Sequence, residues 1–169
     1  MKTHYVIGLH GEGADKMLKG IEQYKRWLDR KAKELARRLA EIGATRASLD
    51  FARAFYNGPS DAHVSVQQSG ENSYTVRADG ETVLFIEFGA GARYGYGHPE
   101  AAQFGMGPGT YPGKGHWDDP KGWYLPKSKV SAAGDKHSYG NPPGMPMYNA
   151  RKEIEQNIES IVREVFAVG

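Results

Sequence analysis

The chain has no cysteine. This absence excludes disulfide bonds, thiol nucleophiles and cysteine-based zinc sites, and it fits synthesis in the cytosol. Long apolar runs are also missing. The strongest is the four-residue segment Val83–Ile86, far short of the roughly 20 residues that span a bilayer. The first seven residues hold one early lysine but no apolar core, so we expect no secretory signal.

Neither positive nor negative charge is in large excess. The 22 lysines and arginines nearly balance the 20 aspartates and glutamates, which gives a net charge of +2. This balance is too small to predict nucleic acid or acidic lipid as the main partner. Of the 169 residues, 39% are hydrophobic and 25% are charged. Such a chain can bury a core, and residues 1–169 are expected to form a single domain.

A long amphipathic helix is predicted for residues 15–43. Asp15 is a suitable N-cap, because its carboxylate can accept hydrogen bonds from the exposed N–H groups of the first turn. Gly43 suits the left-handed position that ends a helix. Between them, apolar residues recur at steps of three or four, the spacing of one helical stripe. The stripe consists of Met17, Ile21, Tyr24, Leu28, Ala32, Leu35, Leu39 and Ile42.

The outer face of this helix is basic. Residues 16–41 contain nine lysines or arginines and four acidic residues, so their charge is nine minus four, or +5. A solvated helix face is the favoured interpretation. A face that meets an acidic partner protein or lines a DNA passage is the alternative.

Three antiparallel strands are predicted for residues 62–68, 73–79 and 82–88. The first two alternate apolar and polar residues, the period of half-buried strands. The third is apolar on both faces and is therefore expected at the centre of the sheet. The dipeptide Asp79-Gly80 predicts a two-residue hairpin turn before this third strand. Residues 4–8 could add an edge strand.

Two further helices are predicted. Residues 45–56 form a short helix that Asn57-Gly58-Pro59 ends. Residues 146–167 form a C-terminal helix with an apolar stripe, and Pro146 begins it at a position where its missing N–H costs nothing. The expected fold is therefore α+β: an antiparallel sheet of three to five strands packed against a long N-terminal helix and a C-terminal helix.

Residues 89–145 have no periodicity. From Gly89 to Pro146 the chain holds 13 of its 22 glycines and eight of its nine prolines. A disordered linker carries few aromatic residues, whereas this segment has many, and these need burial on the same subunit or on a neighbour. We expect an extended arm that becomes fully ordered on assembly. The aromatic residues are Tyr94, Tyr96, Phe104, Tyr111, Trp117, Trp123, Tyr124 and Tyr139.

A hairpin is predicted within this arm. Residues 122–127 could pair with residues 137–139, with the tip at residues 131–135. The glycines that follow Phe88 are expected to let the chain turn sharply and approach another backbone closely.

A set of short motifs resembles a known family. Their order and spacing, rather than any single motif, are similar to the small neck or tail-component proteins of long-tailed bacteriophages and prophages. These proteins are variously described as tail-completion, head–tail joining or minor capsid proteins, and the resemblance covers nearly the whole chain. The motifs are Tyr56-Asn57-Gly58, Phe85–Gly91, His98-Pro99, Gly109–Pro112, Lys121–Pro126 and Gly144–Ala150.

The resemblance implies a structural virion protein, assembled in the cytoplasm of the bacterial host, with no enzymatic activity and no cofactor. Its implied partners are further copies of itself in a cyclic, sixfold ring, head-closure proteins, and tail-terminator or tail-tube proteins. Genomic DNA would pass through the ring without sequence-specific binding, and no membrane is involved. The implied interface or motif residues are Glu87, Phe88, Gly89, Gly91, His98, Pro99, Trp117, Trp123, Tyr124, Pro126, Pro146 and Tyr148.

This chain departs from the family in one respect. Its loop between Ala90 and Trp123 is long and rich in tyrosine and glycine. Within that loop, only the motif residues given above are therefore carried over from the family.

Two other functions remain open. One is a hydrolase with a loop-built cleft around Glu87, His98 and Asp118, in which Glu87 would be a general base. The favoured interpretation is structural, with Glu87 paired with Arg93 or Arg77 or bonded to backbone N–H groups at a strand end. The other is a nucleic-acid-binding domain that uses the basic N-terminal helix, whose affinity would fall steeply with salt.

No catalytic residue and no metal site is predicted. The histidines and aspartates of the arm match no metal-binding spacing, such as two histidines four residues apart on a helix. Surface or turn histidines are the favoured interpretation. The residues considered are His98, His116, His137, Asp118 and Asp119.

Overall fold

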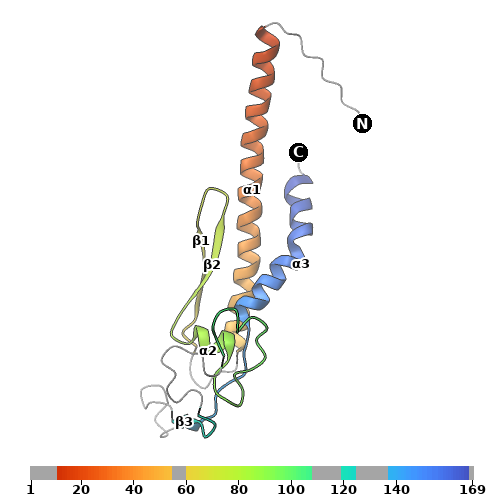
Figure 1. Cartoon of the computed structure of the whole chain (residues 1–169). Coiled ribbons are helices and arrows are strands. Elements are labelled where there is room, and N and C mark those ends of the chain that lie inside the picture. Colours follow the sequence, from red (N-terminus) through yellow and green to blue (C-terminus); the bar gives the residue numbers. More distant parts are fainter. Residues whose placement is uncertain (1–10, 55–59, 108–118, 125–136, 168–169) are drawn as a thin grey trace.

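The computed structural model describes residues 11–54, 60–107, 119–124 and 137–167. These residues form a mixed helix and strand fold (Figure 1). The elements in chain order are α1 (Gly11–Arg53), β1 (His63–Gln68), β2 (Tyr74–Asp79), α2 (Val83–Phe88), β3 (Trp123–Tyr124), β4 (His137–Ser138) and α3 (Pro146–Ala167).

The N-terminal helix is longer than predicted. The expected end at Gly43 and the separate helix at residues 45–56 are wrong, because α1 continues through Gly43 to Arg53. Gly43 has another role: it is buried, and a Cβ atom there would lie 2.6 Å from Cδ1 of Ile154 on α3. The glycine lets α3 approach α1 closely, and the residues that follow it continue the helix.

The first two predicted strands are present as β1 and β2. They pair antiparallel, with His63 opposite Asp79 and Gln68 opposite Tyr74. Their turn is closed by the N–H groups of Ser69 and Gly70, which donate to the Ser73 carbonyl.

The sheet is smaller than expected. Within the described ranges there are two sheets of two strands each, so the predicted sheet of three to five strands is wrong. The predicted third strand, residues 82–88, is the helix α2, and Asp79-Gly80 is therefore not a hairpin turn. A short apolar run has no period that separates a strand from a buried helix.

A distant carboxylate caps the start of α2. Asp61, just before β1, accepts hydrogen bonds from the Glu81 N–H (2.7 Å), from the Thr82 N–H (3.0 Å) and from the Thr82 hydroxyl. Acceptors at this position satisfy N–H groups that a helix start leaves without partners. The hydroxyl of Thr82 and the N–H of Glu81 lower the pKa of Asp61 to about 2, from an ordinary value of 3.8.

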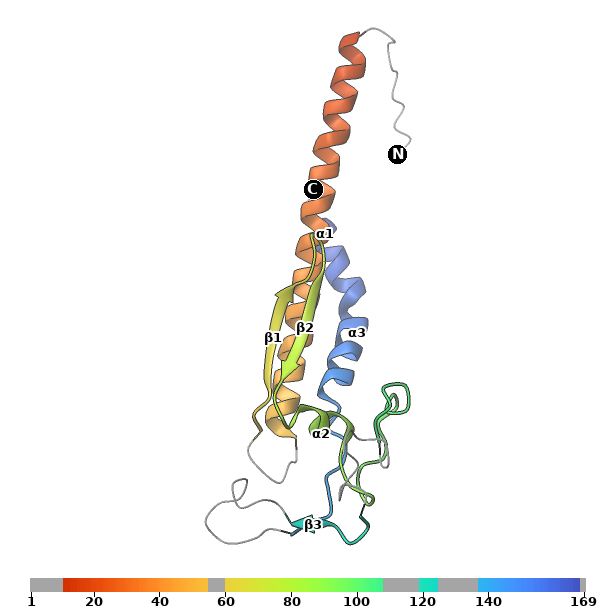
Figure 2. The same cartoon turned by 60° about the vertical axis from the view of Figure 1, so that its left-hand side comes forward.

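The core lies where α2 and α3 meet the C-terminal half of α1. Its central residues are Ala47 and Phe51 of α1, Ile86 of α2 and Ala150 of α3, all 3% exposed or less. In Figures 1 and 2 the β1–β2 hairpin also lies along the C-terminal half of α1, and α3 runs beside α1. Asn149 of α3 donates to Asp50 of α1 (2.9 Å), which adds a polar link between the two helices.

The N-terminal part of α1 projects beyond this body (Figure 1). We call residues 11–28 the α1 arm. Five large apolar side chains of the arm are between 40% and 62% exposed. Trp27, which is half-buried, stacks on Tyr24 at 5.6 Å and meets Phe166 at the end of α3 at 5.8 Å. The exposed side chains are Met17, Leu18, Ile21, Tyr24 and Leu28.

The remaining predictions concern the loop of residues 89–145 and the first residues of the chain. The expected pairing near residue 122 is present as β3 and β4, with Trp123 opposite Ser138 and Tyr124 opposite His137. The predicted hairpin tip at residues 131–135 and the edge strand at residues 4–8 lie outside the described residues.

Candidate functional site

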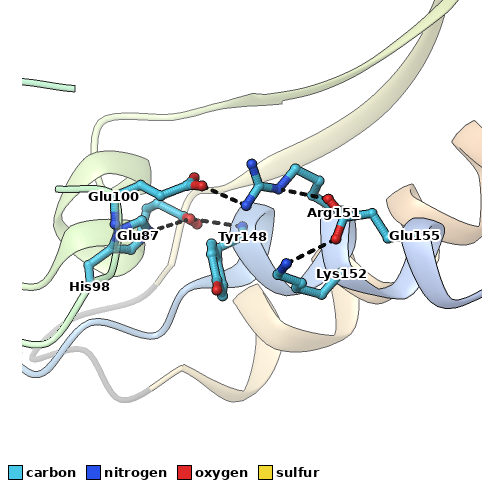
Figure 3. A network of polar contacts seen from close by, with 7 residues as sticks. All are labelled: Glu87, His98, Glu100, Tyr148, Arg151, Lys152 and Glu155. Carbon is cyan, nitrogen blue, oxygen red and sulfur yellow. Dashed lines mark hydrogen bonds and ion pairs between the residues drawn. The ribbon is translucent and has the colours of Figure 1, made fainter. Parts of the chain in front are cut away.

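A buried carboxylate joins three segments that are distant in the sequence. Glu87, near the end of α2, accepts hydrogen bonds from the Met147 N–H (2.7 Å) and the Tyr148 N–H (3.0 Å) in the first turn of α3. His98 Nε2 lies 3.1 Å from Oε1 of the same carboxylate. We call these four residues the Glu87 junction, and Figure 3 shows three of them: Glu87, His98 and Tyr148. Glu87 lies outside α3, yet its carboxylate caps the start of that helix, where the helix dipole attracts negative charge.

The hydrogen bonds of His98 define its tautomer. The Glu100 N–H donates to Nδ1 of His98 at 3.1 Å. Nδ1 therefore carries no proton, and the ring hydrogen lies on Nε2, which donates to Glu87. The side chains of His98 and Glu87 are 1% and 7% exposed, so both nitrogens and both carboxylate oxygens are used in buried structural hydrogen bonds.

Glycines make the backbone crossing beside the junction possible. Ala90 and Asn141 exchange two backbone hydrogen bonds of 2.9 and 3.0 Å. A Cβ at Gly89 would lie 2.8 Å from the Asn141 carbonyl oxygen, and one at Gly140 would lie 1.8 Å from the Ala90 carbonyl oxygen. Gly89, Gly91 and Gly140 all have positive φ. The expected close approach of glycines after Phe88 is therefore present, although they follow a helix rather than a strand.

The sequence reasoning missed Asn141. It is 3% exposed, and its side-chain amide donates to the Phe85 carbonyl at 2.8 Å. The Gly144 N–H also donates to the Ile86 carbonyl at 2.7 Å. These bonds fix the last turn of α2 to the chain that enters α3. The dipeptide Asn141-Pro142 is a turn signal, but nothing in the sequence indicates its partner more than fifty residues away.

Aromatic rings surround the junction. The Phe88 ring lies 4.5 Å from the His98 ring and 5.8 Å from Phe104, and Tyr148 meets His98 edge-on at 5.6 Å. These contacts exclude water from the buried acid–imidazole pair.

Ion pairs close the outer side of the junction. Glu100 pairs with Arg151 of α3 at 2.6 Å, and Lys152 pairs with Glu155 at 2.9 Å (Figure 3). The partly exposed Glu100–Arg151 pair joins the loop after His98 to α3, at a position where such pairs contribute little stability.

The predicted pairing of Glu87 with an arginine is wrong. Arg77 pairs with Asp79 at 2.6 Å, and the Arg93 guanidinium lies 3.9 Å from the centre of the Tyr139 ring. The alternative prediction, that Glu87 binds backbone N–H groups, is confirmed. These groups lie at the start of a helix rather than at the end of a strand.

The hydrolase alternative places Glu87, His98 and Asp118 in one cleft. Glu87 and His98 do meet, with the spacing of a base and the group that orients it. Both side chains are almost completely buried. Neither residue lines the surface groove around Arg46 and Glu153 or the groove between α1, α3 and the β1–β2 hairpin. Asp118 lies outside the described residues, and no group of three potential metal ligands occurs within the described ranges.

The other residues implied by the family resemblance are distributed over the surface and the interior. Pro99 is exposed, Pro146 is buried at the start of α3, and Trp123 is 7% exposed on β3. Tyr124 is 66% exposed. Trp117 and Pro126 lie outside the described residues.

A row of rings lies along the β3–β4 ribbon. Tyr124 meets His137 at 4.8 Å, His137 meets Tyr139 at 4.6 Å, and Arg93 lies over Tyr139. Tyr124 and Tyr139 remain 66% and 40% exposed. Exposed tyrosines of this kind are frequent in protein interfaces.

An apolar groove lies between α1, α3 and the β1–β2 hairpin. Its volume is about 460 Å³. We call it the α1–α3 groove. It lies on the body, next to the part of α1 from which the arm projects, and among the residues that line it are Leu39, Ala40, Asn72, Val76, Met147 and Ile154.

Comparison with protein-family models, with curated proteins and with solved structures found no match for this chain. Among the helices in the described ranges, none combines the length and the apolar character of a membrane-spanning segment.

Proposed function

We propose that this protein is a structural component of the bacteriophage neck or of the head-proximal end of the tail. In this role, copies of the chain form a ring that joins head-closure and tail components. The proposal starts from the resemblance of the motifs between residues 56 and 150, and its structural support is the α1 arm.

The observation that carries the proposal is the exposed apolar side of the α1 arm. Five large side chains lie together on a helix that projects from the body, each 40% or more exposed. Apolar patches of this kind on a soluble protein mark interaction sites. The exposed aromatic side chains near the β3–β4 ribbon add a second surface of the same character, at the other end of the molecule in Figure 2.

The size of the patch fits assembly through repeated contacts. Complete burial of one such side chain contributes about 1.5–3 kcal/mol, so burying the exposed half of five would contribute about 4–8 kcal/mol. Association costs at least about 4 kcal/mol in lost translation and rotation. One such contact is therefore marginal, whereas a closed ring gives each copy two contacts and gains from effective concentration.

The Glu87 junction fits a structural role better than a catalytic one. Both oxygens of Glu87 and both nitrogens of His98 are engaged within the fold, and their side chains are almost completely buried. A general base needs a reachable proton on a substrate. The arrangement instead fixes α2, the loop after it and α3 as one unit that can bear load in an assembly.

Part of the basic face of α1 is neutralised within the fold. Of the nine basic residues between positions 16 and 41, Lys31, Arg37 and Arg38 lie within 4 Å of carboxylates of the same fold. These three paired cations would release fewer counterions on binding phosphate, so they would add little to the salt dependence of a DNA affinity.

The test is the mass of the full chain in solution, measured by size-exclusion chromatography with light scattering. The chain is measured alone and mixed with the proteins encoded by its neighbouring genes, which the proposal expects to include a head-closure or tail-terminator protein. A closed oligomer, or a complex with either neighbour, supports the proposal. A strict monomer that binds neither protein contradicts it.

A further inference from the structure

Four exposed cations lie in line along one side of α1. They recur at steps of seven, four and three residues, so at 3.6 residues per turn they lie within about 60° of one another around the helix axis. Their line extends over about 21 Å at the helical rise of 1.5 Å per residue. We call these residues the basic stripe: Lys19, Arg26, Arg30 and Lys33, all exposed.

The basic stripe is not neutralised by the described part of the chain. None of its members has a carboxylate oxygen within 4 Å there, in contrast to Lys31, Arg37 and Arg38 of the same helix. Glu22 and Asp29 are one turn away from members of the stripe, and neither forms an ion pair with them. The four charges are therefore available to a partner.

The stripe lies on the opposite side of the helix from the apolar side chains of the arm. Ile21 and Leu28 follow members of the stripe by two residues, which is about 200° around the axis. The other residues on the stripe side between positions 19 and 33 are polar: Glu22, Gln23 and Asp29. The stripe therefore offers positive charge without apolar surface.

This combination selects among the possible anionic partners. Protein interfaces are enriched in aromatic residues and depleted in lysine, and a helix binds a membrane surface through an apolar face. Contacts to nucleic-acid phosphates require only charge and hydrogen-bond donors. A phosphate backbone is therefore the partner that fits the stripe best.

We infer that the basic stripe binds the phosphate backbone of duplex DNA without reading its sequence. A duplex carries one negative charge per about 1.7 Å of its axis, so several phosphates lie within reach of the stripe. Single strands fit less well, because their binding sites use aromatic rings on which bases stack, and the stripe has none. The inference rests on the proposed function only in the choice of DNA over RNA.

The two sides of α1 then have different partners. In the proposed ring the apolar side of the arm contacts proteins, and the basic stripe on the other side stays open to DNA. Four cations of a single copy give weak binding. Several copies that present the same stripe to one duplex bind more tightly, because the later contacts form at high effective concentration.

The test is the salt dependence of binding to a short fluorescein-labelled duplex, followed by fluorescence polarisation with the full chain. Neutralisation of four phosphates corresponds to a slope of log affinity against log salt of about −3.6 per bound copy, or about a hundredfold loss between 50 and 200 mM salt. Duplexes of unrelated sequence should bind equally, and a single strand of the same length more weakly. Undetectable binding of the duplex at the lower salt concentration overturns the inference.

A triple variant tests whether the stripe is the binding surface. It combines Arg26→Gln, Arg30→Gln and Lys33→Gln, which leaves one cation of the stripe. The inference expects the slope to fall to about −0.9, with at least tenfold weaker binding at low salt. An unchanged slope overturns the inference, and circular dichroism verifies that the helices remain.

A matched control removes the same net charge elsewhere. Three exposed cations that lie off the stripe are replaced by glutamine, and the slope and the affinity should stay close to those of the parent chain. An equal loss of affinity in this control would show that only the net charge matters and would overturn the inference. The control residues are Lys25, Arg53 and Lys121.

The remaining outcomes separate this inference from the proposed function. Polyglutamate that binds more tightly than the duplex, at equal concentration of charge, would assign the stripe to an acidic protein and overturn the DNA contact. A chain that assembles but whose DNA affinity ignores the triple variant overturns the inference and leaves the neck function standing. A chain that binds DNA through the stripe but stays monomeric, alone and with its neighbours, does the reverse.

Discussion

The α1 arm and the Glu87 junction lie at opposite extremes of burial in one chain. The arm leaves five large apolar side chains 40% or more exposed on a helix that projects from the body and contacts α3 through Trp27 and Phe166. The junction places a carboxylate and an imidazole in the interior, where each polar atom has a partner. The junction is therefore complete within the subunit, whereas the large apolar side chains of the arm stay exposed on it.

The structures of the two regions are determined by different kinds of interaction. The body gains its unique geometry from a few polar bonds between segments far apart in the sequence, because a buried polar group tolerates only one arrangement of partners. The arm gains its helix from local periodicity, and its tertiary partner is left open. Substitutions in the two regions should therefore change different quantities: folding in one, association in the other.

The largest expected effect is that of Glu87→Ala. It leaves the first-turn N–H groups of Met147 and Tyr148 and the Nε2–H of His98 buried without acceptors. We expect the free energy of unfolding to fall by about 3–5 kcal/mol, the range for removal of one partner from a buried charged network. Urea denaturation followed by circular dichroism measures it, at a concentration low enough to keep the chain monomeric.

Ile21→Ala in the arm is the control for this prediction. Its side chain is 52% exposed, so its effect on the unfolding of the monomer should stay within about 0.5 kcal/mol, as for other surface substitutions. Equal effects of the two substitutions would show that the arm is already part of the folded core, and the contrast between the regions would be lost.

The accuracy of sequence reasoning follows the same division. Periodicity predicts the helix from Pro146 to Ala167 and the strands β1 and β2. Half-buried and exposed residues alternate along β2, whereas β1 has three half-buried residues in a row. It failed at residues 82–88, where an apolar run carries no period and the deciding cap comes from Asp61, twenty residues earlier. It also failed at Gly43, where a typical helix-end residue serves contact with α3.

The site was predictable only in part. The motifs predict that Glu87, Phe88, Gly89 and His98 matter, and the structure brings them together. Their actual partners, the N–H groups of the α3 start and the backbone near Asn141, could not be inferred. Long-range hydrogen bonds depend on the folded path of residues 89–145, which has no repeating pattern to reveal it.

The second prediction compares two glycines of positive φ. Gly140 has φ of 97° and faces the Ala90 carbonyl, whereas Gly105 has φ of 64° with no atom within 4 Å of a Cβ placed there. Alanine costs about 1 kcal/mol at either site through backbone strain. At Gly140 the added Cβ must also push apart the two backbone segments that the Ala90–Asn141 hydrogen bonds join. We therefore expect the free energy of unfolding to fall by about 2–4 kcal/mol in total.

Chemical denaturation of Gly140→Ala and Gly105→Ala measures the difference. Hydrogen exchange at the Ala90 and Asn141 amides shows whether the crossing has opened. Similar losses in both variants, with both amides still protected, would mean that close backbone approach contributes nothing at this junction beyond φ.

The smallest expected effect concerns Asp61, which is exposed but caps α2. Its pKa is lowered to about 2 in the folded chain, from an ordinary value of 3.8, by the hydrogen bonds from Thr82 and Glu81. The carboxylate therefore stabilises the fold fully above about pH 4, and this contribution is lost as the pH falls through about 2. Asp61→Asn should cost about 1 kcal/mol near neutral pH, as for loss of a helix cap.

The difference in unfolding free energy between the parent chain and Asp61→Asn is measured by urea denaturation from pH 6 to pH 2. It should stay constant down to about pH 4 and then shrink. Thr82→Val, which removes the hydroxyl donor, should weaken the same pH dependence because it removes the largest cause of the lowered pKa. A difference that stays constant down to pH 2 would mean that the Asp61 charge does not hold α2 in place. The helical form of residues 83–88 would then depend on the burial of Ile86 and Phe88 and on the hydrogen bonds of Glu87 to α3.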